Sequence, residues 1–204
     1  MKMVCESDAE HLLRRCRDGD DAAFGELLQV FRSYLTLLAR LQVGVKLQGK
    51  ADPSDLVQET FLQAHRSFGQ FRGTTEQELL GWLRQILASR VAKMVRHYLG
   101  THRRDARLEQ QLCADLDRSS QALDKGLLDT MSSPSQRASR REQAVILADA
   151  IERLSPEYRE IIVLHHLQSL SLSEVARRLG QSRTQTERLW IRALADLHRF
   201  IKGN

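Results

Sequence analysis

Apolar residues recur every three or four positions along most of the chain, which is the spacing of one face of an α-helix. One long segment of this kind begins at Asp20, whose carboxylate is placed to cap it. Its apolar stripe is Phe24, Leu28, Phe31, Leu35 and Leu38. Almost nothing alternates between apolar and polar residues as a strand does. The pattern therefore predicts an all-α fold.

Residues typical of helix N-termini divide the first hundred residues into further predicted helices. Asp52-Pro53 combines a capping carboxylate with a proline in the first turn, where no N–H is missed. Thr75 with Glu78 forms a capping box, in which each side chain satisfies a backbone N–H of the other residue. We expect the helix that follows to run to about Tyr98, with leucines and valines on one side.

The middle of the chain has a different composition. Residues 106–135 contain Ser119-Ser120, the run Ser132-Ser133-Pro134 and scattered aspartates, which is typical of a linker with a little helix at its start. We therefore predict two small helical domains joined by a flexible linker. Residues 1–105 form the first domain, 106–135 the linker and 136–204 the second domain.

The second domain contains two closely spaced helix signals. Ser171 with Glu174 is a capping box, and Gly180 is placed for the left-handed residue that ends a helix. Ser182 with Gln185 opens the next helix after a turn of about three residues. This spacing predicts a helix-turn-helix, whose second helix enters the major groove of duplex DNA.

Along that second helix, apolar spacing predicts a buried stripe formed by Thr186, Trp190, Ala193, Leu197 and Ile201. The residues expected to face DNA are Arg183, Thr184, Gln185, Glu187 and Arg188. Their side chains suit base edges, since arginine pairs with guanine, glutamine with adenine and glutamate with cytosine. Arg192, one turn further on, suits a phosphate. The alternative is that these charges form only a solvated face.

The charge distribution supports a polyanionic partner. The 204 residues carry a formal net charge of +5. Residues 1–105 hold 16 basic and 13 acidic side chains, and residues 136–204 hold 12 and 8, whereas the linker holds 3 and 5. Both predicted domains are thus basic and the connection between them is acidic, as expected of two DNA-contacting modules on a solvated tether.

Other function classes lack their motifs. The three cysteines show no CxxC spacing and the histidines no HExxH spacing, so we expect reduced thiols, no metal site and no cofactor. A nucleophile elbow and a glycine-rich phosphate loop are also missing, so no residue is predicted to be catalytic. The chain begins without a secretory signal and has no apolar run of membrane-spanning length, which favours a soluble, cytoplasmic protein without membrane contact.

Several runs occur together in a diagnostic order. The run DPSDLVQETFL at 52–62, then Phe71-Arg72-Gly73 and WLRQI at 82–86, resembles region two of the extracytoplasmic-function (ECF) group of sigma factors in the sigma-70 family. The segment from Ile151 to Arg159, with the helix-turn-helix that follows, resembles region four. The run LWIRAL at 189–194 resembles the variant common in planctomycete-type members.

The resemblance implies a non-catalytic subunit that binds core RNA polymerase and promoter DNA, with an anti-sigma factor as a further partner and a monomeric free state. Region two of the family binds the polymerase and the opened −10 element, and region four reads the −35 duplex. The implied polymerase-binding residues are Asp55, Leu56, Gln58 and Glu59. The implied −10 residues are Arg90, Lys93, Arg96, His97, Arg103 and Arg104. The implied −35 residues are Arg183, Thr184, Gln185, Glu187, Arg188 and Arg192.

Three departures from the family pattern leave alternatives open. Arg90 and Lys93 stand near positions where the family has an asparagine and an aspartate, and Glu187 replaces a frequent lysine. These changes keep open a degenerate sigma factor that binds only polymerase or an anti-sigma factor. A one-component transcriptional regulator is the other alternative, since it uses the same helix-turn-helix, on a palindrome. That alternative gives no role to the motif from Asp55 to Phe61.

Overall fold

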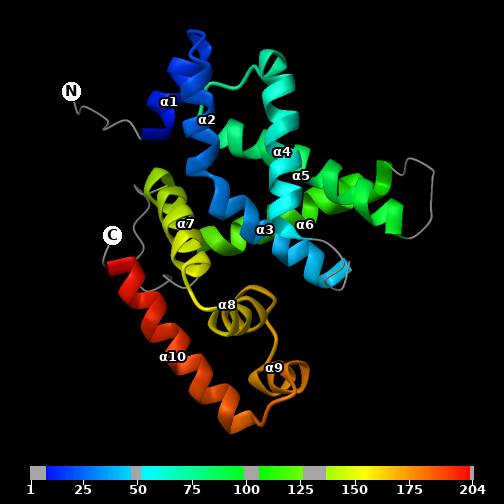
Figure 1. Cartoon of the computed structure of the whole chain (residues 1–204), viewed down its shortest axis with the longest axis vertical. Helices are drawn as coiled ribbons and strands as arrows, with labels where there is room; N and C mark the ends of the chain where they lie inside the picture. Colours follow the sequence, from blue (N-terminus) through cyan, green and yellow to red (C-terminus); the bar gives the residue numbers. More distant parts are fainter. Residues whose placement is uncertain (1–7, 47–51, 99–105, 126–136, 203–204) are drawn as a thin grey trace. The chain divides into compact units, whose positions relative to one another are not determined.

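The computed structural model describes residues 8–46, 52–98, 106–125 and 137–202, and these parts are helical, as predicted (Figure 1). The chain divides into two compact units, residues 1–117 and 118–204. The helices of the first unit are α1 (Asp8–Arg17), α2 (Asp21–Val30), α3 (Arg32–Lys46), α4 (Pro53–Ser67) and α5 (Glu76–Tyr98), with a short 3-10 turn η1 (Phe68–Gln70). The boundary between the units lies within α6 (Ala106–Lys125). No described helix is both long and apolar enough to span a membrane.

Local capping signals place the helices of the first unit. The carboxylate of Asp20 accepts a hydrogen bond from the N–H of Ala23 at 3.0 Å and pairs with Arg15 at 2.6 Å. These two interactions, the backbone bond first, hold the pKa of Asp20 below its usual range. Asp52 caps α4 through the N–H of Ser54 at 2.8 Å. The sequence therefore predicted both helix starts from capping residues alone.

One predicted helix is divided in two. The apolar stripe from Phe24 to Leu38 belongs to α2 and α3, which are separated at Phe31. Phe31 itself is fully buried, and the helical bonds resume when the N–H of Leu35 donates to its carbonyl at 3.0 Å. The apolar spacing continues through the break, so the core face was predicted correctly although the single helix was wrong.

The predicted linker is mostly helix. Helix α6 covers residues 106–125, so the expectation of a little helix at its start was wrong in extent. The reason is an amphipathic stripe with a spacing of four, Leu108, Leu112 and Leu116, of which the last two are fully buried. Two ion pairs join α6 to α5: Arg84 to Asp117 at 2.8 Å and Arg96 to Glu109 at 3.2 Å.

The second unit contains α7 (Arg137–Glu152), α8 (Pro156–Ile162), α9 (Leu172–Leu179) and α10 (Arg183–Lys202). Helix α8 continues into one π-helical turn, η2 (Val163–Leu167). The hinge between α7 and α8 is held by Arg159, which donates to the carbonyls of Ile151 at 3.2 Å, Leu154 at 3.1 Å and Glu152. This guanidinium supplies the donors that the end of α7 lacks.

Candidate nucleic-acid interface

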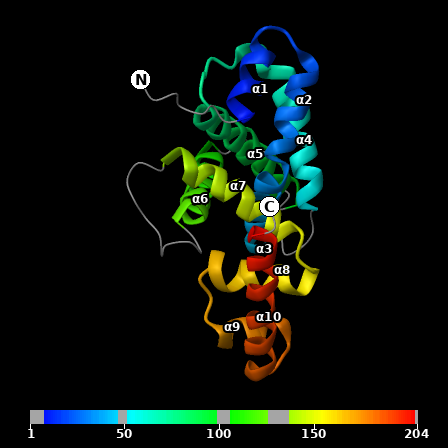
Figure 2. The same ribbon diagram turned by 90° about the vertical axis from the view of Figure 1, so that its left-hand side faces the viewer.

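Helices α9 and α10 form the predicted helix-turn-helix (Figure 2). The Ser171–Glu174 capping box opens α9, and Gly180 ends it with a φ of 66°, in the left-handed region that glycine enters without strain. The Ser182–Gln185 box opens α10, with the N–H of Gln185 donating to the serine hydroxyl at 3.3 Å. All three local predictions are confirmed, so the start of α10 is fixed by its own caps.

The predicted −35 residues lie at the exposed start of α10, but they are not equally available. Arg183 pairs with Glu187 at 2.8 Å, four residues on, in an exposed ion pair that solvent screens. The side-chain oxygen of Gln185 accepts from the N–H and hydroxyl of Ser182, at 3.1 and 2.9 Å. A glutamine whose oxygen is engaged in this way does not present the donor–acceptor pair that bidentate adenine recognition needs. Thr184, Arg188 and Arg192 are exposed and complete the predicted set.

The opposite side of α10 anchors the helix. Thr186, Ala193 and Leu197 are buried, as the spacing predicted, and the Thr186 hydroxyl donates to the carbonyl of Ser182 at 3.1 Å. The buried hydroxyl of Thr186 therefore has a hydrogen-bond partner, which allows a threonine where an apolar residue would be expected. Trp190 and Ile201 are only half-buried. The buried side fixes which residues of α10 face outward.

Trp190 joins α10 to the π-turn η2. Its indole N–H donates to Nε2 of His166 at 2.9 Å, and the two rings lie 6.1 Å apart at 26°. The neighbouring His165 uses Nδ1 to contact the carbonyl of Leu170 at 2.7 Å. An indole can only donate, so the bond requires an unprotonated Nε2 on His166.

The geometry at His166 predicts that the second unit loses stability as the pH falls. Burial first, and then the charge of His165, lower the pKa of His166 below its ordinary value. As pH falls, the unfolded state, with a histidine pKa of about 6.5, therefore takes up the proton first. The contribution of His166 to stability is fully present above about pH 6.5 and is lost as pH falls toward the lower folded pKa. We expect the urea midpoint, followed by Trp190 fluorescence in a Trp82→Phe background, to fall between pH 7.5 and 5.5.

Two variants separate this histidine from the others. His166→Gln keeps a neutral acceptor for the indole and removes the titration, so its midpoint should change less over the same pH range. His198→Gln removes an exposed histidine of α10 and should keep the wild-type pH dependence. A His166→Gln midpoint that falls as steeply as the wild-type value would show that another group is responsible.

The exposed side of α4 carries the predicted polymerase-binding residues. Asp55, Gln58 and Glu59 are exposed and follow one another at helical spacing. Leu62, one turn further on, is 60% exposed and was missed, although a leucine among polar residues at this spacing was visible in the sequence. We call these four residues the α4 face. Leu56 was assigned to the same set, but its side chain is fully buried, so it supports the face from within and does not form part of its surface.

The predicted basic face of α5 is narrower than expected. Lys93 and His97 are exposed, whereas Arg90 is half-buried with its Nε enclosed and unpaired. Arg96 is committed to Glu109 at 3.2 Å, with only 17% of its side chain exposed. Arg103 and Arg104 lie outside the described residues. On the described part of this face, the basic side chains without an ion pair are therefore the exposed Lys93 and His97 and the half-buried Arg90.

The sequence analysis missed two surface residues that lie near the predicted DNA-binding residues. Tyr98 is 47% exposed at the end of α5, where its ring meets that of His97 edge-on at 5.5 Å. An exposed aromatic beside cations is a stacking platform for single-stranded bases. Arg177 is exposed on α9, the helix that crosses the DNA backbone in a helix-turn-helix, and suits a phosphate.

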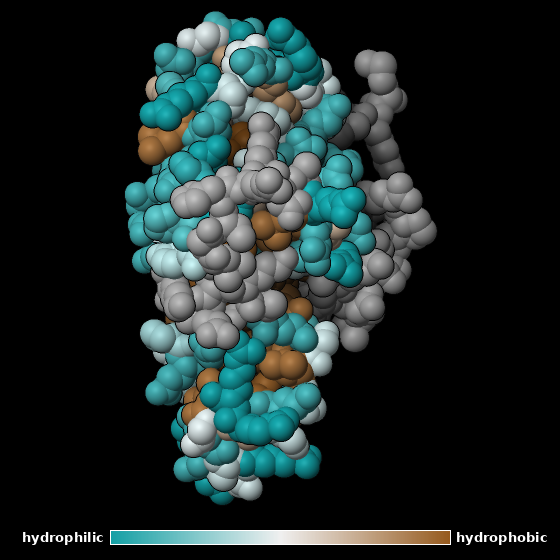
Figure 3. All heavy atoms as spheres, turned by 90° about the vertical axis from the view of Figure 1, so that its right-hand side faces the viewer, coloured by the Kyte–Doolittle hydropathy of each residue, from teal (hydrophilic) through white to brown (hydrophobic). Residues whose placement is uncertain are grey.

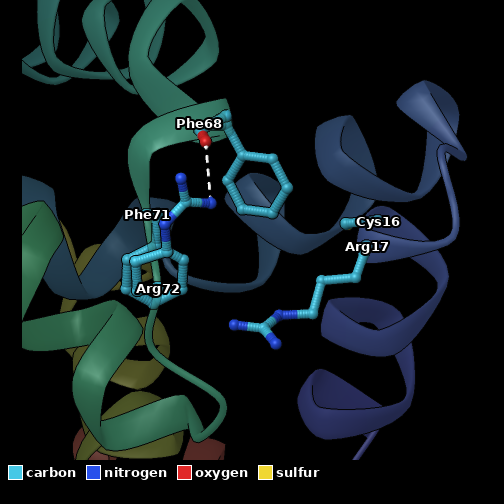
Figure 4. Close-up of a pocket in the computed structure, with 6 residues that line it drawn as sticks. Cys16, Arg17, Phe68, Phe71 and Arg72 are labelled. Carbon is cyan, nitrogen blue, oxygen red and sulfur yellow. Dashed lines mark hydrogen bonds between the residues drawn. The ribbon is translucent and has the colours of Figure 1, made fainter.

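A cavity of about 330 Å³ lies in the first unit between α1 and the segment that joins α4 to α5 (Figure 4). Arg17 enters it from α1, and Phe68, Phe71 and Arg72 line the opposite side. An aromatic cluster continues behind the wall, where Phe71 stacks on Trp82 with centroids 5.0 Å apart. Aromatic rings and guanidinium groups are the chemistry that holds an unstacked base and its phosphate.

The thiol in the cavity wall is not a reactive group. Cys16 is buried, and burial raises its pKa to about 11. At neutral pH the thiol is therefore protonated and a poor nucleophile. Among the described residues, no group of three or more histidine, cysteine or acidic side chains is arranged to hold a metal ion.

Known proteins match both units of the chain. Residues 30–100 match the family description "Sigma-70 region 2" and residues 144–197 match "Sigma-70, region 4". The chain is 27% identical to the ECF RNA polymerase sigma factor BldN of Streptomyces coelicolor, over 93% of this chain and 64% of BldN. It is 28% identical to the RNA polymerase sigma factor NccH of Alcaligenes xylosoxydans xylosoxydans, over 99% of each chain.

One further sequence relative agrees with these two, and one solved structure is also similar. The ECF RNA polymerase sigma factor SigM of Mycobacterium tuberculosis is 28% identical over 96% of this chain and 85% of its own length. A solved structure, that of an RsbN–BldN complex, aligns with 92% of this chain and 97% of the matched chain at 24% identity, with a TM-score of 0.31. The two region matches together take in more than half of the chain and follow the order found in the sequence. The chain therefore belongs to the sigma-70 family, within its extracytoplasmic-function group.

Proposed function

We propose that the chain binds core RNA polymerase and directs promoter recognition and transcription initiation as a non-catalytic subunit that needs no cofactor. The observation that carries the proposal is the presence, in order, of regions two and four on two helical units. Because core polymerase and promoter DNA are cytoplasmic in bacteria, the proposed location is the cytoplasm. The run LWIRAL at 189–194 favours the planctomycete-type variant within the group.

The proposal assigns a partner to each surface. The α4 face would dock on core polymerase, since exposed carboxylates and amides suit a basic partner helix. The cavity at Arg17 and Phe71, together with Lys93, His97 and Tyr98, would hold the opened −10 strand. Thr184, Arg188 and Arg192 would contact the −35 duplex, and Arg177 its backbone. These assignments leave Arg96 as a structural residue, because it is largely buried and paired with Glu109, whereas the exposed Arg183 remains a candidate DNA contact.

Transcription from purified components tests the function. The chain is mixed with bacterial core polymerase and genomic DNA, and promoter-dependent transcripts are mapped. Specific start sites that appear only when the chain is present would support the proposal. Failure to bind core polymerase would overturn it. Binding without initiation would favour the degenerate sigma factor instead, an alternative supported by the pairing of Arg96 with Glu109.

An anti-sigma factor is a further proposed partner. BldN, at 27% identity, has a solved structure in complex with a protein named RsbN. Co-expression with proteins from neighbouring genes, followed by co-purification and loss of transcription, would identify such a partner.

The α4 face can be tested separately. Asp55→Ala is expected to lower the affinity for core polymerase about tenfold, as for a central interface residue, while circular dichroism stays unchanged. Asp55 also lies in the first turn of α4, where a carboxylate stabilises the helix dipole. Asp21→Ala removes the corresponding carboxylate from the first turn of α2 and is the matched control. The affinities are measured by titrating labelled chain with core polymerase. Equal affinities of the two variants would exclude the α4 face as a polymerase-binding surface.

A further inference from the structure

One large apolar side chain is exposed on α10. Ile191 is 60% exposed, whereas Ala193 and Leu197 of the same helix are buried. It lies three residues after Arg188 and directly before Arg192, both also exposed. Thr184, Arg188, Ile191 and Arg192 share one side of the helix, since they are spaced by four, three and one residues. We call this side the reading face.

The charges of α10 leave the reading face cationic. Each of its two carboxylates pairs with an arginine of the same helix, Glu187 with Arg183 at 2.8 Å and Asp196 with Arg199 at 3.1 Å. Arg188 and Arg192 make no ion pair with any residue that the structure describes. Ile191 is therefore one apolar group held between two free guanidinium groups.

A protein partner does not fit this arrangement well. Protein interfaces have an apolar core made of several large side chains. In the described part of the second unit, Ile191 is the single large hydrophobic residue that is exposed. On the side shown in Figure 3, the end of the unit formed by α9 and α10 is mostly hydrophilic. An anionic partner with an isolated apolar group suits the reading face better.

Duplex DNA has such a group. The one methyl group on the base edges of the major groove is the 5-methyl of thymine, and apolar side chains contact it. Ile191 lies eight residues after the start of α10, about 12 Å along the helix axis, which is within reach of base edges when the helix lies along the groove. Arg188 and Arg192 then meet phosphates or guanine on either side.

We propose that Ile191 is a specificity residue that reads the 5-methyl group of one thymine in the −35 duplex. The inference rests on the proposed function of the helix-turn-helix as a duplex reader, and it adds the base and the atom that are read. Arg188 and Arg192 hold the helix on either side of that thymine.

Deoxyuridine, which lacks only the methyl group of thymine, gives a direct test. Duplexes are first selected from a random library with the full-length chain bound to bacterial core polymerase. Each thymine of the selected −35 element is then replaced singly by deoxyuridine. One replacement should weaken binding about three- to fivefold, the effect of one methyl group. Ile191→Ala should bind the thymine duplex equally weakly and should be insensitive to that replacement.

The controls distinguish the possible failures. His198→Ala changes an exposed residue two turns further along α10 and should keep the wild-type response to deoxyuridine. No sensitive thymine, or a sensitivity that persists in Ile191→Ala, would overturn the inference and leave the proposed function standing. Weaker binding of Ile191→Ala to core polymerase, without a change in deoxyuridine response, would overturn it in favour of a protein contact. If no duplex is selected at all, the proposed function also fails.

Discussion

Arg159→Met is expected to lower the free energy of unfolding of the second unit by about 2–4 kcal/mol. The guanidinium of Arg159 donates to three carbonyls at the end of α7 and pairs with the carboxylate of Glu152 at 3.5 Å. The side chain of Arg159 is 19% exposed. After its substitution, water can therefore reach the carbonyls and replace the lost donors only in part. Methionine keeps the apolar stem but removes all of these donors and the positive charge beside Glu152.

Urea unfolding measures this loss, with Trp190 fluorescence as the probe in a Trp82→Phe background common to all variants. Arg159→Lys keeps the positive charge but not the planar fork of donors, so its loss should be smaller. Arg177→Met is the matched control, because Arg177 is exposed on α9. A change within about 0.5 kcal/mol is expected there. If Arg159→Met unfolds at the same urea concentration as Arg177→Met, the hydrogen bonds from Arg159 do not stabilise the hinge between α7 and α8.

Gly73→Ala is expected to destabilise the first unit by about 1–3 kcal/mol and to disturb the cavity. A methyl group at Gly73 would overlap the ring of Phe71, with 2.6 Å to its Cε2, and would lie 2.7 Å from Cβ of Glu78. Phe71 must then leave its stacked position 5.0 Å from Trp82. Trp82 fluorescence, measured in a Trp190→Phe background, should therefore change together with stability. Open-complex formation at a cognate promoter should fall in the chain that keeps Trp190.

Two other glycines show whether the effect is local. Gly25→Ala, on the exposed side of α2, meets no atom within 4 Å and should raise stability by about 0.5–1 kcal/mol, because alanine favours the helix. Gly69→Ala, in the η1 turn beside the same cavity, also meets no atom within 4 Å. It should leave Trp82 fluorescence unchanged. If the Gly73→Ala protein is as stable as the Gly69→Ala protein, Phe71 moves without lowering the free energy of unfolding.

Local signals in the sequence were sufficient for the helix-turn-helix. The Ser171 and Ser182 boxes and the left-handed Gly180 depend on residues within four positions of each other, so they could be predicted from spacing alone. The break at Phe31 could not, because no glycine or proline marks it. The π-turn η2 likewise has no known signature in its residues.

The site residues were predicted by chemical type, whereas their availability depends on contacts between distant positions. Arg96 is neutralised by Glu109, and Leu56 is covered by the packing of its unit, neither of which follows from a motif. The pair of Arg183 with Glu187 is different, since a spacing of four on a helix predicts it. Its effect on DNA contacts was therefore open to sequence analysis and was missed.

Helix α6 also affects where the chain can be truncated. A fragment ending at residue 105 follows the predicted domain boundary, but it removes Glu109 and Asp117 and leaves the half-buried Arg96 and Arg84 without their carboxylates. It also removes the buried Leu112 and Leu116. Such a fragment would carry guanidinium groups that have lost their carboxylates, and it would bind polyanions of any sequence. A fragment meant to report on promoter specificity must extend at least through Asp117, where the first unit ends.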